Sequence, residues 1–331
     1  MSTRDGFVGA IGNTPLIALP KLSAALGRTI LAKAEFLNPG GSVKDRAAKA
    51  IVEDAEARGA LTPGGTIVEG TAGNTGIALA LIAAARGYRA IIAIPDDQSQ
   101  EKIAMLRTFG ADVRVVPAVP FANPENYYHV ARRIAEQIPG ALWADQFNNT
   151  ANRGAHYATT GPEIWNALDG KLDAFVAAAG TGGTLAGTAA YLKERDPRIR
   201  TAVCDPYGSS LYAHVKCGTL DTEGDSNLEG IGIKRITENF RDARVDDAIR
   251  VNDRSAVEMA YWLLREEGLY AGGSSALNVV GAARLARSLP EGSAVATILC
   301  DGGDRYRSRL WNPEWLAEND CLPTARDLDF L

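Results

Sequence analysis

Residues 173–195 read DAFVAAAGTGGTLAGTAAYLKER, a glycine-rich turn between an apolar run and a helical stretch. The apolar run over 173–179 predicts a strand with both faces covered. The stretch over 185–195 stops before Pro197, because proline cannot continue a helix. Glycines let the backbone approach an anion closely, and a helix N-terminus offers N–H groups without partners, so the turn over 180–184 predicts a phosphate-binding loop. A turn that only packs the helix on the sheet is the alternative.

The same alternation of strand and helix continues along the chain, which predicts an α/β fold with mostly parallel sheets. Further strands are expected at 66–69, 89–94, 112–116, 201–204, 248–251 and 294–299, and further helices at 75–85, 98–109, 123–137, 255–267 and 276–289. Asn123 followed by Pro124 is typical of the start of a helix. The segment 206–246 has no regular period, and an irregular segment of this length is more often functional than a plain connection.

Composition excludes several classes of protein. The 331 residues correspond to about two domains at ~150 residues each. A net charge of −5, with no basic block among aromatic residues, argues against nucleic-acid binding. The 4 cysteines and 3 histidines lack metal-site spacing, so no metal is expected. No apolar stretch approaches the ~20 residues of a membrane span, and no apolar signal core follows the N-terminus, so a cytoplasmic location is expected.

A second donor-rich loop lies at 69–76, EGTAGNTG, again between an expected strand and an expected helix. It carries two threonine hydroxyls, one amide side chain and several glycine N–H groups, which suit a carboxylate or a phenolate oxygen. A purely structural turn is the alternative. Ligands of open α/β sheets bind at the carboxyl ends of the strands, so this loop and the turn at 180–184 are expected to face one crevice.

A third segment, NPGGSVKDR over 38–46, brings Ser42 and Lys44 to the start of a helix. A lysine in the first helical turn is electrostatically unfavourable, because the helix dipole prefers anions there. The same field would lower the pKa of Lys44 and help it to form a Schiff base. A solvated lysine is the alternative, since charged side chains are mostly exposed.

Together these segments resemble the cysteine synthase / cystathionine β-synthase family of fold-type-II pyridoxal-phosphate enzymes. The similarity runs from IGNTPL at 11–16 to DGGDRY at 301–306 and so covers most of the chain. It is closest to a cysteine-synthase-like subgroup associated with cysteine desulfhydrases. The resemblance implies two α/β domains like those of the tryptophan synthase β-subunit. A smaller domain would span 45–150, and a larger one, formed by 1–44 and 151–331, would bind the cofactor phosphate.

The resemblance also implies a role for each motif. Lys44 would be the catalytic lysine that binds pyridoxal 5'-phosphate covalently, and Asn74 would hold the ring hydroxyl oxygen. The residues expected to hold the cofactor phosphate are Gly180, Thr181, Gly182, Gly183 and Thr184. Those expected to bind the substrate are Thr71, Gly73, Thr75, Gln146 and Gly230.

The implied activity is β-replacement, which makes L-cysteine from O-acetyl-L-serine, or another activated serine, and sulfide through an aminoacrylate intermediate. Cysteine desulfhydrase and cystathionine β-synthase activity are the enzymatic alternatives. A weakly active homologue that binds a serine acetyltransferase tail is the non-enzymatic one. The family is usually homodimeric, so a homodimer is expected. A nicotinamide-dependent dehydrogenase is disfavoured, because neither glycine loop has the required spacing.

Two residues depart from the family pattern, and two other features are interpreted as structural rather than functional. Ala72 replaces a serine of the carboxylate loop, and Gly302 stands where the family places a serine against the pyridine nitrogen. The pair Lys234–Arg235 is interpreted as a solvated surface pair, with recognition of an anionic leaving group such as phosphate as the alternative. The two cysteines at expected strand ends are interpreted as small core residues, namely Cys204 and Cys300.

Overall fold

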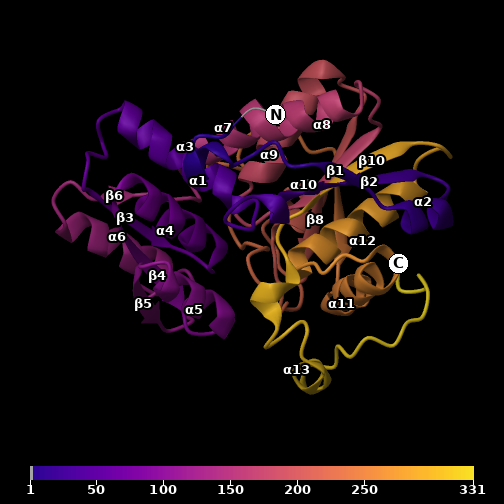
Figure 1. The fold of residues 1–331 in the computed structure, drawn as a ribbon. Coiled ribbons are helices and arrows are strands. Elements are labelled where there is room, and N and C mark those ends of the chain that lie inside the picture. Colours follow the sequence, from indigo (N-terminus) through magenta and orange to yellow (C-terminus); the bar gives the residue numbers. More distant parts are fainter. Residues whose placement is uncertain (1–2) are drawn as a thin grey trace.

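The computed structural model describes residues 3–331 as two α/β lobes, each built around its own sheet (Figure 1). The larger sheet has the strand order β1-β2-β10-β7-β8-β9. β1 pairs with β2 antiparallel, and the other pairs are parallel. The strands are β1 Leu16–Ala18, β2 Thr29–Ala34, β7 Ala174–Ala178, β8 Arg200–Pro206, β9 Asp247–Val251 and β10 Ala294–Leu299.

Helices cover both faces of the larger sheet. In β7, Ala174 and Val176 join one hydrophobic cluster, with α2, α11 and α12, whereas Phe175 and Ala177 join another, with α8, α9 and α10. Both sets of side chains are therefore buried, which explains why β7 is apolar throughout. The helices of this lobe are α2 Pro20–Leu26, α7 Ala151–Ala155, α8 Gly161–Ala167, α9 Gly183–Arg195, α10 Leu211–Cys217, α11 Asp253–Trp262, α12 Gly273–Arg287 and α13 Pro313–Glu318.

The smaller sheet has the order β5-β4-β3-β6, and all its pairs are parallel. Val68 and Ala93 pack against α6 on one face, and Ile92 packs against α4 and α5 on the other. The strands are β3 Thr66–Gly70, β4 Arg89–Pro95, β5 Asp112–Val116 and β6 Leu142–Trp143; the helices are α1 Gly6–Gly9, α3 Lys44–Ala57, α4 Asn74–Arg86, α5 Gln100–Thr108 and α6 Tyr127–Gln137.

Irregular helical turns connect several of these elements. Short 3₁₀ turns occupy Glu35–Leu37 and Gly303–Tyr306, and π-helical turns occupy His156–Thr160 and Leu263–Glu267. The second π-helical turn ends the stretch predicted as a single helix over 255–267. Within residues 3–331, no helix is both long and apolar enough to cross a membrane.

The predicted fold class is confirmed, because both sheets are mostly parallel and flanked by helices. The predicted start of one helix at Asn123 is wrong. The side chain of Asn123 accepts a hydrogen bond within a turn, from Glu125 N, whereas α6 begins at Tyr127 with Asn126 as its N-cap. All strands of the smaller sheet fall inside the predicted domain 45–150, but the domain limits themselves stay a prediction.

Candidate active site

A cleft of about 820 Å³ receives residues from both lobes. The turn after β7 contributes Gly180, Thr181, Gly182 and Thr184, though not Gly183, and the loop after β3 contributes Thr71 to Thr75. Both segments follow the carboxyl ends of parallel strands, where ligands of α/β folds bind. Lys44, Gln146 and Gly230 line the same cleft. Most of the predicted site residues therefore meet in one place.

The turn over 180–184 ends at the start of α9. Gly182 has a φ of 86° and is the N-cap of α9, and Thr181 Oγ1 accepts a hydrogen bond from Gly183 N, the first N–H of this helix, over 3.4 Å. A Cβ at Gly182 would lie 2.6 Å from Phe240 Cβ, and one at Gly180 would lie 2.7 Å from Gly230 O. Only glycine therefore fits at these two positions, and the N-terminal N–H groups of α9 that follow Gly183 remain open to an anion.

Side chains from α7 and the adjoining π-helical turn hold the two threonines of this turn. Asn152 Nδ2 donates to Thr181 Oγ1 over 3.0 Å. His156 lies 3.2 Å from Thr184 Oγ1 through Nε2 and 2.8 Å from Thr160 Oγ1 through Nδ1. Burial, together with the charges of Arg46 and Lys44, holds the pKa of His156 well below its ordinary value. His156 is therefore neutral and positions Thr184 rather than supplying charge.

Lys44 is the first residue of α3 and points into the cleft. Among residues 3–331 its ammonium group makes no ion pair, since no carboxylate lies within 4.0 Å of it. Burial lowers the pKa of Lys44, although the neighbouring Cys300 and Asp301 act in the opposite direction. A lysine with these surroundings is a more effective nucleophile and base than a solvated one.

Close packing and side-chain hydrogen bonds hold the loop over 71–75 in place. Gly73 has a φ of 132°, and a Cβ there would lie 2.5 Å from Lys102 Cδ. Thr75 Oγ1 donates to Gln146 Oε1 over 2.5 Å, and Gln146 Nε2 donates to Glu69 Oε1 over 3.0 Å. These contacts fix the hydroxyl and amide groups of the loop at the wall of the cleft.

Comparison with known proteins agrees with this geometry. Residues 8–301 match the family described as "Pyridoxal-phosphate dependent enzyme". The chain belongs to this family. It is 54% identical over 322 residues to cysteine synthase 1 of Neurospora crassa, an alignment that covers 96% of this chain and 86% of the relative.

Two solved structures extend the likeness to three dimensions. The O-acetylserine dependent cystathionine β-synthase from Helicobacter pylori gives a TM-score of 0.85 at 37% identity, covering 93% of this chain and 99% of that one. The O-ureido-L-serine synthase gives a TM-score of 0.86 at 34% identity, covering 96% and 100%. The resemblance to the cysteine synthase / cystathionine β-synthase family is therefore confirmed.

The residues of the cleft fit pyridoxal phosphate, the cofactor of this family. The cofactor carries a phosphate group and an aldehyde. The N-terminus of α9 with its glycine turn fits the phosphate, and the unpaired amine of Lys44 fits the aldehyde. Both groups line one cleft, so this pyridoxal-phosphate enzyme has a partner for each end of its cofactor.

Asn74 has partners that the sequence did not indicate. Its Nδ2 donates to Asp301 Oδ2 over 2.6 Å, and its Oδ1 accepts a hydrogen bond from Arg305 Nη1 over 2.6 Å. Tyr306 also donates to Asp301 Oδ2, again over 2.6 Å. These residues of the larger lobe orient the Asn74 amide from 227 positions away along the chain, a separation at which no local pattern reports the contact.

The packing around Gly302 leaves room for a side chain. A Cβ at Gly302 would come no closer than 3.8 Å to any neighbour, so nothing in the packing requires glycine.

Cys204 is buried, as expected of a core residue. Cys300, by contrast, lines the cleft and accepts a hydrogen bond from Asn278 Nδ2 over 3.4 Å. Burial raises the pKa of the Cys300 thiol to about 12.

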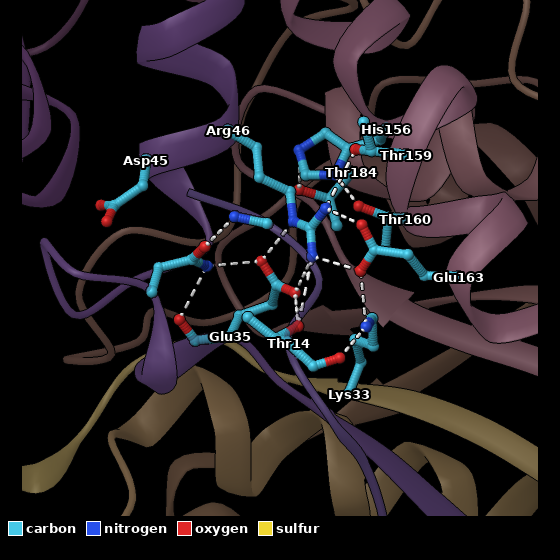
Figure 2. A network of polar contacts seen from close by, with 12 residues as sticks. Thr14, Lys33, Glu35, Asp45, Arg46, His156, Thr159, Thr160, Glu163 and Thr184 are labelled. Carbon is cyan, nitrogen blue, oxygen red and sulfur yellow. Dashed lines mark hydrogen bonds and ion pairs between the residues drawn. The ribbon is translucent and has the colours of Figure 1, made fainter. Parts of the chain in front are cut away.

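A buried ionic network anchors α3 two residues beyond Lys44 (Figure 2). Arg46 donates to Glu35 through Nε over 2.7 Å and to Glu163 through Nη1 over 2.7 Å. Lys33 pairs with Glu163 over 2.6 Å. Two cations and two carboxylates balance, so the network fixes the helix that carries Lys44 without leaving an unpaired buried charge. The sequence analysis missed it, because its members are far apart in the chain.

Proposed function

We propose that this enzyme makes L-cysteine from O-acetyl-L-serine and sulfide with release of acetate. The observation that carries the proposal is the placement of Lys44, an unpaired lysine of lowered pKa, in one cleft with two donor loops. The identity of 54% to the Neurospora crassa cysteine synthase 1 supports the same reaction.

Each part of the cleft then has a binding role. We assign the cofactor phosphate to the turn over 180–184, the cofactor aldehyde to Lys44 and the ring hydroxyl oxygen to Asn74. We assign the substrate carboxylate to Thr71, Gly73, Thr75 and Gln146, which line the cleft. Gly230, with a φ of 79°, would place the backbone of its loop beside the reacting carbon.

The cofactor, when bound, supplies an electron-accepting ring that stabilises negative charge on the amino-acid α-carbon. Lys44 Nζ would remove the α-proton, which its lowered pKa favours by increasing the fraction of neutral amine. The loop over 71–75 would hold the substrate carboxylate, so that the α-hydrogen faces Lys44. Glycines at 180 and 182 allow the backbone of this turn to pack closely against Gly230 and Phe240.

Cystathionine β-synthase activity is a second candidate, because one of the matching solved structures is an O-acetylserine dependent cystathionine β-synthase. This reaction uses the same amino-acid donor and replaces sulfide by an amino-acid thiol. Desulfhydration of L-cysteine uses the same donor loops with sulfide as the leaving group. Substrate comparison therefore separates these candidates.

The test measures initial rates for three reactions of the cofactor-loaded enzyme: cysteine from O-acetyl-L-serine and sulfide, cystathionine from O-acetyl-L-serine and homocysteine, and sulfide from L-cysteine. The largest kcat/KM is expected for the first. If only sulfide release is found, the protein is a desulfhydrase and the proposed function is wrong.

A matched pair of variants tests the assigned lysine. Lys44→Ala is expected to lower the rate of cysteine formation at least about 100-fold, because it removes the α-proton acceptor. Lys49→Ala, on the same helix but outside the cleft, is expected to retain the wild-type rate. An active Lys44→Ala enzyme would overturn the assignment of Lys44.

Three further proposals rest on the family resemblance: a homodimer, binding of a serine acetyltransferase tail in the cleft, and a cytoplasmic location. The first is tested by light scattering of the purified protein, for which twice the monomer mass is expected. The second is tested by competition, since a bound tail peptide would inhibit cysteine synthesis competitively with O-acetyl-L-serine.

A further inference from the structure

Arg235 is surrounded by three aromatic rings at the cleft. Its guanidinium carbon lies 4.3 Å from the centroid of the Phe121 ring, 4.9 Å from that of Phe147 and 5.2 Å from that of Tyr128. All four residues line the cleft that contains Lys44. Rings at these distances hold a guanidinium by cation–π contact and restrict its motion.

Within residues 3–331, the side chain of Arg235 makes no hydrogen bond and no ion pair. The carboxylate of Asp145 is bound instead by Asn148 Nδ2, at 3.2 and 3.3 Å. Asp225 is almost fully exposed and lies 3.9 Å from Lys234. Arg235 is therefore half-buried with its five N–H donors free, and a planar guanidinium of this kind matches the oxygens of a carboxylate or a phosphate.

Two anions of the proposed reaction, the cofactor phosphate and the substrate α-carboxylate, are already assigned to other partners. The turn over 180–184 is assigned to the cofactor phosphate and the loop over 71–75 to the α-carboxylate of the substrate. Arg235 lies on a different segment, 218–246, and so provides a third position for an anion. O-Acetyl-L-serine carries no second ionised carboxylate or phosphate that would fill it before the reaction, since the carboxylate of acetate forms only when the leaving group departs.

We propose that Arg235 binds a second carboxylate or phosphate, carried by the leaving group or by the incoming thiol. This inference rests on the proposed function. With O-phospho-L-serine, the β-carbon–oxygen bond breaks, inorganic phosphate leaves, the thiol sulfur bonds to the β-carbon and the thiol proton is released. With O-acetyl-L-serine and a thiol that carries a carboxylate, the β-carbon–oxygen bond breaks, acetate leaves, the thiol sulfur bonds to the β-carbon and the thiol proton is released. The anion then enters with the nucleophile.

The kinetic test uses substrate pairs that differ by one anionic group. O-Phospho-L-serine is compared with O-acetyl-L-serine as donor, and 3-mercaptopropionate with 2-mercaptoethanol as acceptor. In Arg235→Gln, kcat/KM is expected to fall at least about tenfold more for the anionic member of one pair than for its neutral partner. A selective loss for the donor pair places the anion on the leaving group, and one for the acceptor pair places it on the thiol.

Three control variants separate recognition from folding. Arg241→Gln removes an exposed arginine of the same segment that pairs with Glu238, and it is expected to leave both selectivity ratios unchanged. Arg235→Lys keeps the charge but not the planar fork and should restore part of the selectivity. Phe121→Leu removes one ring and should weaken selectivity in the same direction as Arg235→Gln.

A binding measurement keeps this inference separable from the proposed function. Titration of the cofactor-loaded enzyme with O-phospho-L-serine and with L-serine, followed by cofactor absorbance, needs no turnover. If the leaving group carries the anion, Arg235→Gln is expected to weaken binding of O-phospho-L-serine about tenfold and to leave L-serine binding unchanged. If the thiol carries it, the variant is expected to lower the kinetic selectivity for the anionic thiol about tenfold and to leave L-serine binding unchanged. Equal effects on both members of every pair would overturn the inference, whereas a wild type that makes no cysteine would overturn only the proposed function.

Discussion

Glu69 is a buried carboxyl group at the end of β3, directly before the loop assigned to the substrate. Burial, together with the charge of Asp145, raises the pKa of Glu69 to about 8. Glu69 is therefore neutral in the folded protein between about pH 4.5 and 8, while the unfolded chain is ionised over this range. Because the unfolded state has lost a proton that the folded state retains, stability falls as the pH rises through this window.

Replacing Glu69 by glutamine fixes the neutral form. Wild-type protein is expected to lose about 2–4 kcal/mol of unfolding free energy from this group between pH 5 and 8.5. In Glu69→Gln the loss should be smaller, and the variant should equal or exceed the wild type at pH 8.5. Thermal unfolding midpoints of the cofactor-loaded protein at several pH values measure this.

Two other buried carboxyl groups shift in the same direction, with the pKa of Asp45 raised to about 7 and that of Asp205 to about 6. The variant should therefore flatten the pH dependence without abolishing it. Identical pH profiles for Glu69→Gln and wild type would show that Glu69 is ionised in the folded state.

At the scale of single residues, the sequence predicted which residues lie in the cleft better than it predicted their hydrogen-bond partners. Lys44, Asn74, Gly180 and Gly182 lie in the cleft as expected, because loop position after a strand already determines which edge of the sheet they reach. The contacts of Asn74 with Asp301 and Arg305 could not be predicted, since they join segments more than 200 residues apart. Cys300 was misplaced because a strand end can face either the core or a cleft.

At the scale of elements, close packing fixes α9, the helix that follows the turn assigned to the cofactor phosphate. Gly187 faces the segment that includes α7 and the π-helical turn after it. A Cβ there would overlap with Arg153 O and would lie 2.8 Å from Tyr157 N and 2.9 Å from His156 Cβ. Because two of these atoms belong to the backbone, they cannot move aside as a flexible side chain would. Gly187 therefore allows α9 to approach its neighbour closely.

Alanine at this position tests the packing. Gly187→Ala gains up to about 1 kcal/mol of helix propensity but is expected to lose about 1–3 kcal/mol overall through overpacking. Gly154→Ala, on the facing helix α7, is the matched control, because its Cβ would meet nothing within 4 Å. It should be neutral or stabilising. Urea unfolding of both variants measures the difference, and the same sign for both would contradict the packing argument.

Two strands, β5 and β10, have the bounds that the sequence predicted. β10 has the predicted bounds of 294–299, because six consecutive residues suit a strand covered on both faces. The start of α6 was predicted four residues early, since Asn123 and Asn126 are equally good N-caps by type and only the backbone path selects between them. The π-helical turn over 156–160 leaves no mark on the hydrophobic period and was not predicted.

At the scale of the whole molecule, a second buried ion pair joins the two lobes besides those that Arg46 of α3 makes with Glu35 and Glu163. Lys102 of α5 pairs with Glu229 of the larger lobe over 2.7 Å, and both side chains are almost fully buried. The Lys102 ammonium also lies 4.3 Å from the centroid of the Tyr306 ring. The pair links residues 127 positions apart, so the two-lobed fold could be predicted from the sequence but this bridge could not.

Breaking the bridge should affect both stability and substrate binding. Lys102→Met leaves Glu229 buried with only Arg309, at 3.5 Å, as a cation, so a loss of about 2–4 kcal/mol in unfolding free energy is expected. The KM for O-acetyl-L-serine should rise, because without its pair to Glu229 the side chain at position 102 is no longer fixed beside Gly73. Unfolding curves and initial rates measure the two effects.

The double variant Lys102→Met/Glu229→Gln removes both charges, and its loss of stability should be smaller than the sum of the single losses. Arg114→Met is the matched control, since Arg114 pairs with Asp112 on the surface over 2.7 Å. It is expected to change stability by less than about 0.5 kcal/mol, as exposed pairs contribute little. Additive losses in the double variant would show that the two lobes do not depend on this pair, and the rise in KM would then need another cause.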